Sequence, residues 1–239
     1  MKLSCVILAG GRGTRLAGVL TDRPKPMALT AGKPFIEWVI AYYSRFGMRN
    51  YVVSLGHMAS VAQAYFNARE AGNAIVTTVV EREALGTGGA FLYAARAAEA
   101  DAYLLTNGDS LLLADLYPAL ELLDDESVDG VIVGRYMDDA SRYGTLRAGS
   151  DNVLQGFEEK RAGSGVINGG IYLFKHRLLE KFPAFTPMSI EQQGIPLLLK
   201  QGAKIMVTVS DAPFLDIGLP DTLRQAEGFI RTHFLKEGV

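Results

Sequence analysis

The chain has 239 residues, of which 49% are hydrophobic and 21% are charged, and its formal net charge at pH 7 is −2. This composition is ordinary for a folded enzyme. The small net charge excludes a global positive field for nucleic acid or an anionic membrane, so phosphate binding has to be local. No segment reaches the ~20 apolar residues that cross a bilayer, and the N-terminus lacks a signal-peptide pattern. Because Cys5 is the single cysteine, no intramolecular disulfide can form, and we expect a cytoplasmic protein.

The first part of the chain alternates short apolar runs with helical patterns. Strands are predicted at Leu3–Ala9, Tyr51–Leu55, Ala74–Val80, Ala102–Thr106 and Gly130–Tyr136, and helices at Pro34–Phe46, Ser60–Ala71, Thr87–Ala98 and Leu113–Leu123. Runs that are apolar on both faces and alternate with helices predict a mostly parallel, doubly wound, Rossmann-like sheet in a three-layer α/β/α domain. In such a sheet, ligands bind beyond the carboxyl ends of the strands.

The pattern changes after Tyr143. Short runs separated by Gly, Asp or Asn turns predict a small antiparallel addition with strands at Thr145–Arg147, Val153–Glu158 and Val166–Phe174. A helix at Ile190–Gln201, a strand at Ala203–Val209 and a closing helix at Leu219–Leu235 are expected to follow. With neither linker nor repeat, residues 1–239 are expected to form a single domain.

A glycine-rich loop follows the first strand, with the sequence Leu-Ala-Gly-Gly-Arg-Gly-Thr-Arg-Leu from Leu8 to Leu16. Glycines let backbone N–H groups curl around an anion, and Arg15 adds a planar fork suited to phosphate oxygens. The loop is not a Walker A motif, because Gly-Lys-Ser/Thr is missing. It is not a dinucleotide fingerprint either, because Leu16 stands at the third glycine position. A tight turn with surface arginines is the alternative.

Lys25 lies between two prolines in Arg23-Pro24-Lys25-Pro26. Proline restricts the backbone on both sides, so this lysine loses less entropy than a free one when it binds phosphate. Taken alone, the segment would be interpreted as a surface lysine in a proline-rich loop.

Together, the loop and the Pro-Lys-Pro segment resemble the sugar-1-phosphate nucleotidylyltransferase family, in which an arginine and a lysine have the same order and spacing as Arg15 and Lys25. The resemblance implies a Mg²⁺-dependent enzyme that joins a nucleoside triphosphate to a sugar 1-phosphate and releases pyrophosphate. It also implies catalytic roles for Arg15, Lys25 and Asp109. The residues that it implies to bind nucleotide in this loop are Leu8, Ala9, Gly10, Gly11, Gly13 and Thr14.

A second glycine-rich segment, from Glu81 to Ala90, ends a strand and opens a helix. It resembles the stretch of the family that reads the base, which implies that Glu81, Gly86 and Thr87 bind the nucleotide. Many relatives have proline where this chain has Ala84, so the start of this loop is expected to be less rigid here.

Two distant acidic residues form the predicted metal site. Asp109 follows a strand in Asn107-Gly108-Asp109, a tripeptide that by itself is an ordinary turn. Asp216 interrupts an apolar strand, where a carboxylate needs a cation or several donors. The resemblance implies that these two carboxylates hold Mg²⁺ and that Asn107 and Gly108 meet the substrate. Asp221 is interpreted as part of the first turn of the closing helix.

The sugar phosphate is expected to bind residues in the second half of the chain. Glu158-Glu159-Lys160 and Asn168-Gly169 resemble sugar-binding segments of the family. Either glutamate could contact the sugar, and Glu159 is preferred because it adjoins Lys160. Residues 1–140 are therefore expected to bind mainly the nucleotide, and residues 141–239 mainly the sugar phosphate.

The resemblance is closest to short bacterial members that join GTP to D-glycero-D-manno-heptose 1-phosphate for surface glycans. Alternatives are transfer to mannose 1-phosphate, a uridylyl- or cytidylyltransferase, and a non-catalytic nucleotide-sugar sensor, which the retention of Asp109, Asp216, Lys25 and Arg15 argues against. No histidine is expected to act as general base. His57 follows a strand end and could border the pocket, but it is interpreted as a loop residue. Members of the family often form homodimers, so a homodimer is possible here too.

Overall fold

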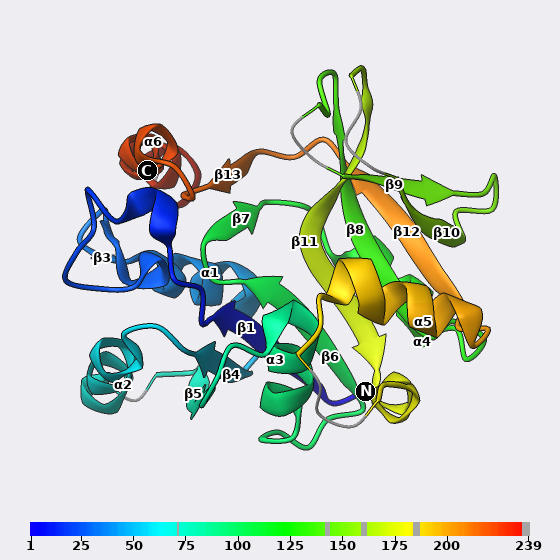
Figure 1. Ribbon diagram of the computed structural model, residues 1–239, viewed down its shortest axis with the longest axis horizontal. Coiled ribbons are helices and arrows are strands. Elements are labelled where there is room, and N and C mark those ends of the chain that lie inside the picture. The colour runs from blue at the N-terminus through cyan, green and yellow to red at the C-terminus, as the bar shows by residue number, and fades with distance from the viewer. Residues whose placement is uncertain (71, 142–143, 159–161, 184–186, 236–239) are drawn as a thin grey trace.

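The computed structural model describes residues 1–70, 72–141, 144–158, 162–183 and 187–235 (Figure 1). One large sheet dominates it. Its long strands run in the order β12-β8-β11-β6-β1-β4-β5. Four adjacent strands pair with one another in parallel: β1 (Leu3–Ala9), β4 (Asn50–Leu55), β5 (Ile75–Val80) and β6 (Ala102–Asn107). This is the parallel half that the sequence predicts.

The second half of the sheet is organised around β11 (Gly165–Lys175), which is antiparallel to both of its long neighbours, β6 and β8 (Gly130–Met137). Outside β8 lies β12 (Ile205–Ser210), parallel to it. The antiparallel hairpin of β9 (Thr145–Ala148) and β10 (Leu154–Glu158) joins this half of the sheet through β11. The antiparallel addition predicted from the sequence is therefore present.

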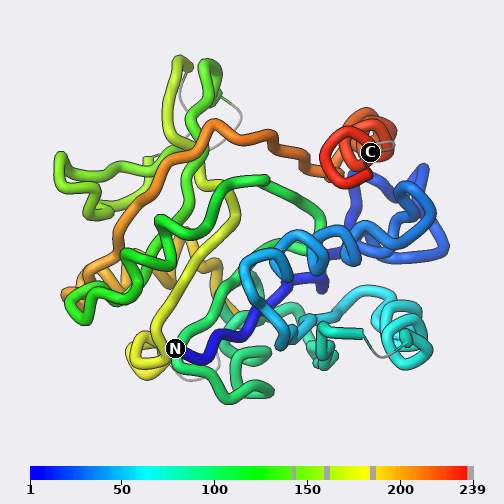
Figure 2. Tube along the Cα trace, turned by 180° about the vertical axis from the view of Figure 1, so that it is seen from behind, coloured from blue at the N-terminus to red at the C-terminus, as the bar shows by residue number. Residues whose placement is uncertain are grey.

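Helices cover both faces of the sheet, as Figures 1 and 2 show from opposite sides. The helices α1 (Phe35–Ser44), α4 (Tyr117–Asp124) and α6 (Pro220–Phe234) contribute to one apolar core, together with α2 (Ala59–Ala68). On the other face, α3 (Gly86–Ala95) and α5 (Ile195–Lys200) form a second core. The structure thus has the three-layer α/β/α architecture.

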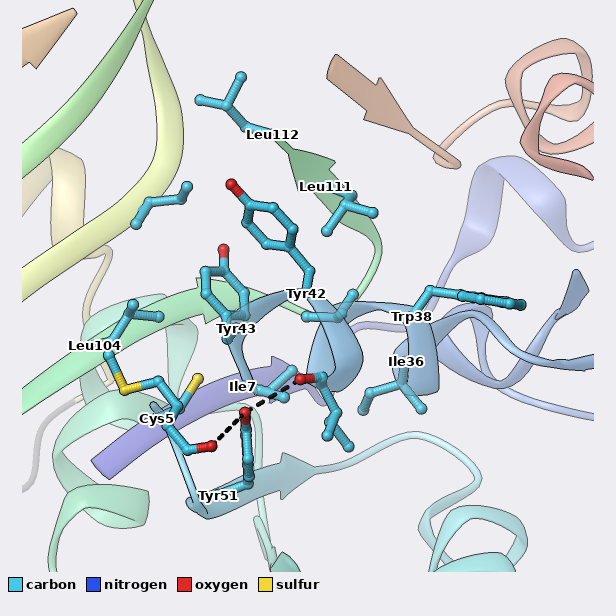
Figure 3. Close-up of a cluster of buried hydrophobic side chains, with 14 of the residues drawn as sticks. Cys5, Ile7, Ile36, Trp38, Tyr42, Tyr43, Tyr51, Leu104, Leu111 and Leu112 are labelled. Carbon is cyan, nitrogen blue, oxygen red and sulfur yellow. Dashed lines mark hydrogen bonds between the residues drawn. The ribbon is translucent and has the colours of Figure 1, made fainter. Parts of the chain in front are cut away.

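The first core is built by α1 packing on the sheet (Figure 3). Because side chains alternate across a strand, Cys5 and Ile7 of β1 face this core, whereas Val6 faces the other one. Tyr43 of α1 is fully buried, and its hydroxyl forms a 2.8 Å hydrogen bond with that of Thr106 at the end of β6. This contact fixes the helix relative to the strand end that leads into the site.

The predicted helix at Leu113–Leu123 is wrong at its start. Residues Ser110–Leu112 form a short strand, β7, which pairs antiparallel with β13 (Phe214–Asp216), and the helix begins at Tyr117. The pairing continues to Leu113, whose N–H donates to the carbonyl of Pro213 at 3.0 Å. Leucine-rich sequence fits either a buried strand or a helix, and here the partner strand from the other end of the chain decides.

The predicted helix at Ile190–Gln201 consists of two parts, the π-helix η4 (Ile190–Gly194) followed by α5. Other short elements are the strands β2 (Leu29–Thr30) and β3 (Lys33–Pro34), which pair with each other, and the 3₁₀ helix η3 (His176–Lys181). Among the described residues, no helix is both long and apolar enough to span a membrane.

Candidate active site

The carboxyl ends of the parallel strands bring the predicted loops together. Leu8 near the end of β1 is in register with Asn107 at the end of β6, and the N–H of Gly108 donates to the carbonyl of Leu8 at 2.8 Å. A Cβ at Gly108 would lie 3.0 Å from that carbonyl oxygen and 3.2 Å from the ring of Pro26. The glycine therefore lets the turn before Asp109 fit closely between the first strand and the lysine segment.

The loop after β1 packs tightly against its neighbours. A Cβ at Gly10 would lie 2.5 Å from Oε1 of Glu81, and the carbonyl of Gly10 accepts a hydrogen bond from the N–H of His57 at 3.1 Å. Gly13 has a φ of +60°, and a Cβ there would lie 3.1 Å from Cγ of Lys25. After Gly13 the loop continues as the 3₁₀ helix η1 (Thr14–Leu16), in which Arg15 is exposed.

Lys25 begins the 3₁₀ helix η2 (Lys25–Met27), with buried prolines on either side. Its Nζ lies 2.8 Å from Oδ2 of Asp109, and the lysine and aspartate side chains are 18% and 31% exposed. Lys25 stands 16 residues after the end of β1, and Asp109 stands two residues after the end of β6. The fold thus places their opposite charges in direct contact.

The pairing of β7 with β13 brings Asp216 beside Asp109. Asp216 is in register with Ser110, and the N–H of Ile217 donates to the carbonyl of Asp109 at 3.0 Å. Burial raises the pKa of Asp216, the charge of Asp109 raises it further, and Lys25 and Arg15 oppose this effect. The N–H of Gly218 donates to Oδ1 of Asp216 at 2.7 Å. The Asp216 carboxylate therefore interacts electrostatically with Asp109 and with both cations.

This donor set fits a magnesium ion. Mg²⁺ prefers oxygen ligands and is usually held by one or two carboxylates, with substrate phosphates and water completing the octahedron. Asp109 and Asp216 supply two carboxylates that repel each other in a partly buried place, a repulsion that a divalent cation would relieve. Within the described ranges, no group of three or more His, Cys, Asp and Glu residues could hold a metal by itself.

A cavity of about 490 Å³ lies between the two glycine-rich segments. Six of the residues predicted to bind nucleotide line it, namely Leu8, Gly10, Gly11, Glu81, Gly86 and Thr87. Gly13 and Lys25 instead line a smaller cavity of about 220 Å³ on the other side of the loop. Ala9 is buried in the core and Thr14 is exposed outside both cavities, so their nucleotide roles stay predictions.

The position of Glu81 in the larger cavity is fixed by two donors. The hydroxyl of Ser54 donates to Oε1 at 2.9 Å, and the N–H of Leu85 donates to Oε2 at 3.3 Å. Gly86 has a φ of +68°, and a Cβ there would lie 2.4 Å from the carbonyl oxygen of Met188. Only glycine combines this conformation with this close approach.

Residues that the sequence interpretation did not assign to the site also line these cavities. Gly56 lines the larger cavity, and Arg12 and His57 line both. Gly56 and His57 follow the end of β4, so the rule that ligands bind at the carboxyl ends of parallel strands could have found them. His57 lies in a loop, as the sequence interpretation has it, and it also borders both cavities.

Asn168 and Gly169, which are predicted to bind the sugar, lie at an irregularity of β11. The register of β11 with β8 shifts between Asn168 and Ile171, so Gly169 and Gly170 form a bulge. A Cβ at Gly170 would lie 3.0 Å from Nδ2 of Asn107, which places the bulge beside the end of β6. Glu158 ends β10. Glu159 and Lys160 lie outside the described residues, and the choice between the two glutamates stays a prediction.

Comparison with known proteins agrees with this geometry. The sequence profile of the family described as "Nucleotidyl transferase" matches residues 4–233. The chain belongs to this family. A D-glycero-alpha-D-manno-heptose 1-phosphate guanylyltransferase from Aneurinibacillus thermoaerophilus is 33% identical over 94% of this chain and 97% of its own length. A protein of the same name from Campylobacter jejuni is 32% identical over 92% of this chain and 96% of its own length.

A solved structure supports the fold as well as the family. HddC from Yersinia pseudotuberculosis, crystallised in complex with GMP-PN, has a TM-score of 0.83 and 34% identity, covering 96% of this chain and 100% of that one. The family match confirms the resemblance drawn from the motifs, and the structural match confirms the predicted Rossmann-like sheet with its antiparallel addition.

Proposed function

We propose that this protein joins GTP to D-glycero-α-D-manno-heptose 1-phosphate, giving the nucleotide sugar and pyrophosphate. The observation that carries the reaction type is the convergence of Asp109 and Asp216 beside Lys25 at the glycine-rich loop. The choice of substrates is supported by the two relatives with this activity in their names, which align with nearly the whole chain.

Each group has a role in bringing two anions together. Asp109 and Asp216 would hold Mg²⁺, which when bound neutralises charge at the α-phosphate. Lys25 neutralises charge from the protein side, and the loop from Gly10 to Arg15 binds the triphosphate. A sugar phosphate oxygen attacks the α-phosphorus in line, and pyrophosphate leaves beside Arg15. This nucleophile is ionised at pH 7, so no side chain has to remove a proton, and positioning plus electrostatics supplies the catalysis.

Glu81 supports guanine as the base. A carboxylate has about four acceptor sites, and Ser54 and Leu85 occupy one on each oxygen, which leaves each oxygen able to accept another donor. Guanine presents two adjacent donors, its N1–H and its exocyclic amine, on one edge. Uracil presents one N–H flanked by carbonyl oxygens, which a carboxylate repels. A glutamate at this position therefore favours GTP over UTP.

The sugar phosphate is proposed to bind between the end of β6 and the bulge of β11. Asn107, Gly108, Asn168 and Gly169 would line this place, and Glu159 and Lys160 are proposed to contact the sugar phosphate as well. Residues 1–140 then act mainly on the nucleotide and 141–239 mainly on the sugar phosphate. A cytoplasmic location and a homodimer remain predictions, the first supported by the buried free thiol of Cys5.

A pyrophosphate-release panel tests the proposal. The purified protein with Mg²⁺ is offered GTP, ATP, UTP and CTP, each with heptose, mannose, glucose and N-acetylglucosamine 1-phosphates. We expect the highest kcat/KM for GTP with the heptose phosphate. Preference for mannose 1-phosphate, or for UTP or CTP, would correct the substrates but keep the reaction. No pyrophosphate from any pair would overturn the proposal in favour of a non-catalytic nucleotide-sugar sensor.

A further inference from the structure

Glu191, in the π-helix η4 (Ile190–Gly194), accepts hydrogen bonds from three hydroxyl groups that come from three parts of the chain. Its Oε1 accepts from the hydroxyl of Tyr172 at 2.7 Å. Its Oε2 accepts from the hydroxyls of Ser189 at 2.8 Å and Thr87 at 3.1 Å. Neither the motif analysis nor the proposed reaction gives this carboxylate a role.

One branch of this network leads to the predicted sugar site. The Tyr172 hydroxyl has a single hydrogen, which it gives to Glu191, so its oxygen accepts from Nδ2 of Asn168. Oδ1 of Asn168 in turn accepts from the N–H of Gly170 at 3.0 Å, inside the β11 bulge. The direction of every bond therefore follows from the charge on Glu191, and the network fixes which way the Asn168 amide faces.

The other branch leads to the nucleotide loop. Thr87 follows Gly86 in the first turn of α3, and its hydroxyl oxygen accepts from the N–H of Ile190 at 2.8 Å while its hydrogen goes to Glu191. The backbone supports the same junction, because the N–H of Gly88 donates to the carbonyl of Met188 at 2.9 Å. Glu191 thus joins the loop that holds the base to the strand that holds the sugar.

The chemistry of the network requires a carboxylate. An ionised glutamate can accept from all three hydroxyls, whereas a glutamine of the same shape would present an NH₂ group to one side of the network. The ring of Tyr172 is buried and would pack equally well as phenylalanine, so its hydroxyl serves the network rather than the core. Removing that hydroxyl would leave Nδ2 of Asn168 and Oε1 of Glu191 without this partner.

We propose that Glu191 is a positioning residue for the sugar 1-phosphate: through Tyr172 it orients Asn168 toward the sugar, and through Thr87 it ties this strand to the nucleotide loop. The inference rests on the proposed function, because it assigns Asn168 to the sugar. The inference adds two separate effects of Glu191. The hydrogen bond to Tyr172 affects sugar binding, and the hydrogen bond to Thr87 affects nucleotide binding.

The experiment compares Tyr172→Phe, Glu191→Gln and the double variant by the KM of each substrate, with GTP and heptose 1-phosphate. Tyr172→Phe cuts only the sugar branch, so we expect the KM of the sugar phosphate to rise about tenfold and that of GTP to stay within about twofold. Glu191→Gln disturbs both branches and should raise both KM values. The KM of the sugar phosphate in the double variant should be less than about twofold higher than in Glu191→Gln alone, because both substitutions break the same chain of hydrogen bonds to Asn168.

Tyr103→Phe is the matched control. Tyr103 is also a buried tyrosine of the sheet, but its hydroxyl bonds the carbonyl of Ala98 at 3.0 Å and Nδ1 of His176 at 3.2 Å, away from the site. It should lower the melting temperature by an amount similar to Tyr172→Phe and change neither KM by more than about twofold.

Three results would overturn the inference. Equal rises of both KM values in Tyr172→Phe, or the same small changes as in Tyr103→Phe, would reduce the network to a structural role. Multiplying losses in the double variant would show that Glu191 and Tyr172 act separately. These results need an active wild-type enzyme, so they are distinct from failure of the proposed function, in which the wild type makes no product and both ideas fall.

Discussion

Asp216 lies where a carboxylate lowers stability unless it has a partner. It is partly buried, and both its burial and the charge of Asp109 raise its pKa. The hydrogen bond from the Gly218 N–H and the charges of Lys25 and Arg15 compensate only in part. Such an arrangement is typical of a functional site, because it is kept in spite of its cost to the fold.

Asp216→Asn should therefore separate activity from stability. We expect kcat to fall about a hundredfold or more, which corresponds to about 2.7 kcal/mol of transition-state stabilisation. The melting temperature without metal should stay the same or rise, because one of two repelling charges is gone. Pyrophosphate release and thermal unfolding measure the two effects. The exposed Asp211→Asn is the control and should change neither, whereas near-normal turnover in Asp216→Asn would remove this residue from the metal site.

At the scale of elements, the start of α3 shows how a helix can be placed by a contact outside its own sequence. Gly86 begins the helix with a φ of +68°, and its Cα packs closely against the carbonyl of Met188. The N–H of Met188 donates to the carbonyl of Leu85 at 2.8 Å. Hydrogen bonds with Met188, which packs in the second core, thus hold the loop that is predicted to bind the nucleotide.

Gly86→Ala should disturb this junction. A Cβ would meet the Met188 carbonyl, and a left-handed conformation costs a non-glycine residue about 1–2 kcal/mol. We expect the free energy of unfolding to fall by at least that amount and the KM of GTP to rise, as chemical denaturation and steady-state kinetics would measure. Gly228→Ala is the opposite case: it lies in α6 with open space around it and should stabilise the protein by about 1 kcal/mol. An unchanged KM in Gly86→Ala would contradict the placement of this loop.

At the scale of the whole molecule, the late strands are held together by a charged group far from the catalytic loops. Asp129, just before β8, accepts from Nε of Arg177 at 2.7 Å and from the N–H of Lys204 at 2.9 Å. Burial by itself raises the pKa of Asp129, but the hydrogen bonds from Lys204 and Arg177 outweigh it, and the pKa lies below the usual value. Asp129 thus connects β8 with the segments that follow β11 and precede β12.

The effect of Asp129 on stability should depend on pH in a defined direction. When the pKa of a carboxyl is lower in the folded state than its value of about 3.9 in the unfolded state, its ionised form stabilises the fold at pH values above about 3.9. This contribution disappears as the pH falls through the pKa of the folded state. Asp129→Asn should lower the free energy of unfolding by about 2 kcal/mol at pH 7 and by much less near pH 3. Urea unfolding at both pH values measures this difference. The exposed Asp124→Asn is the control, and an equal loss at both pH values would argue against an ionised Asp129.

The local patterns of the sequence were sufficient for the elements whose geometry depends on neighbours in the chain. The parallel strands, their helices and the glycine-rich loops were predictable because apolar periodicity, glycine and proline act within a few residues. The motifs also pointed to charged groups that the fold brings together, since Arg15, Lys25, Asp109 and Asp216 stand in segments of distinctive sequence.

Only the tertiary structure decided which distant segments meet. The strand β7 was not predicted, and the helix was expected to begin too early, at Leu113, because nothing near Ser110 indicates that residues 214–216 will pair with it. The antiparallel position of β11 beside β6 and the three hydroxyls around Glu191 likewise depend on contacts between distant parts of the chain. Such contacts leave no periodic pattern, because they form only when loop closure and core packing bring separate segments together.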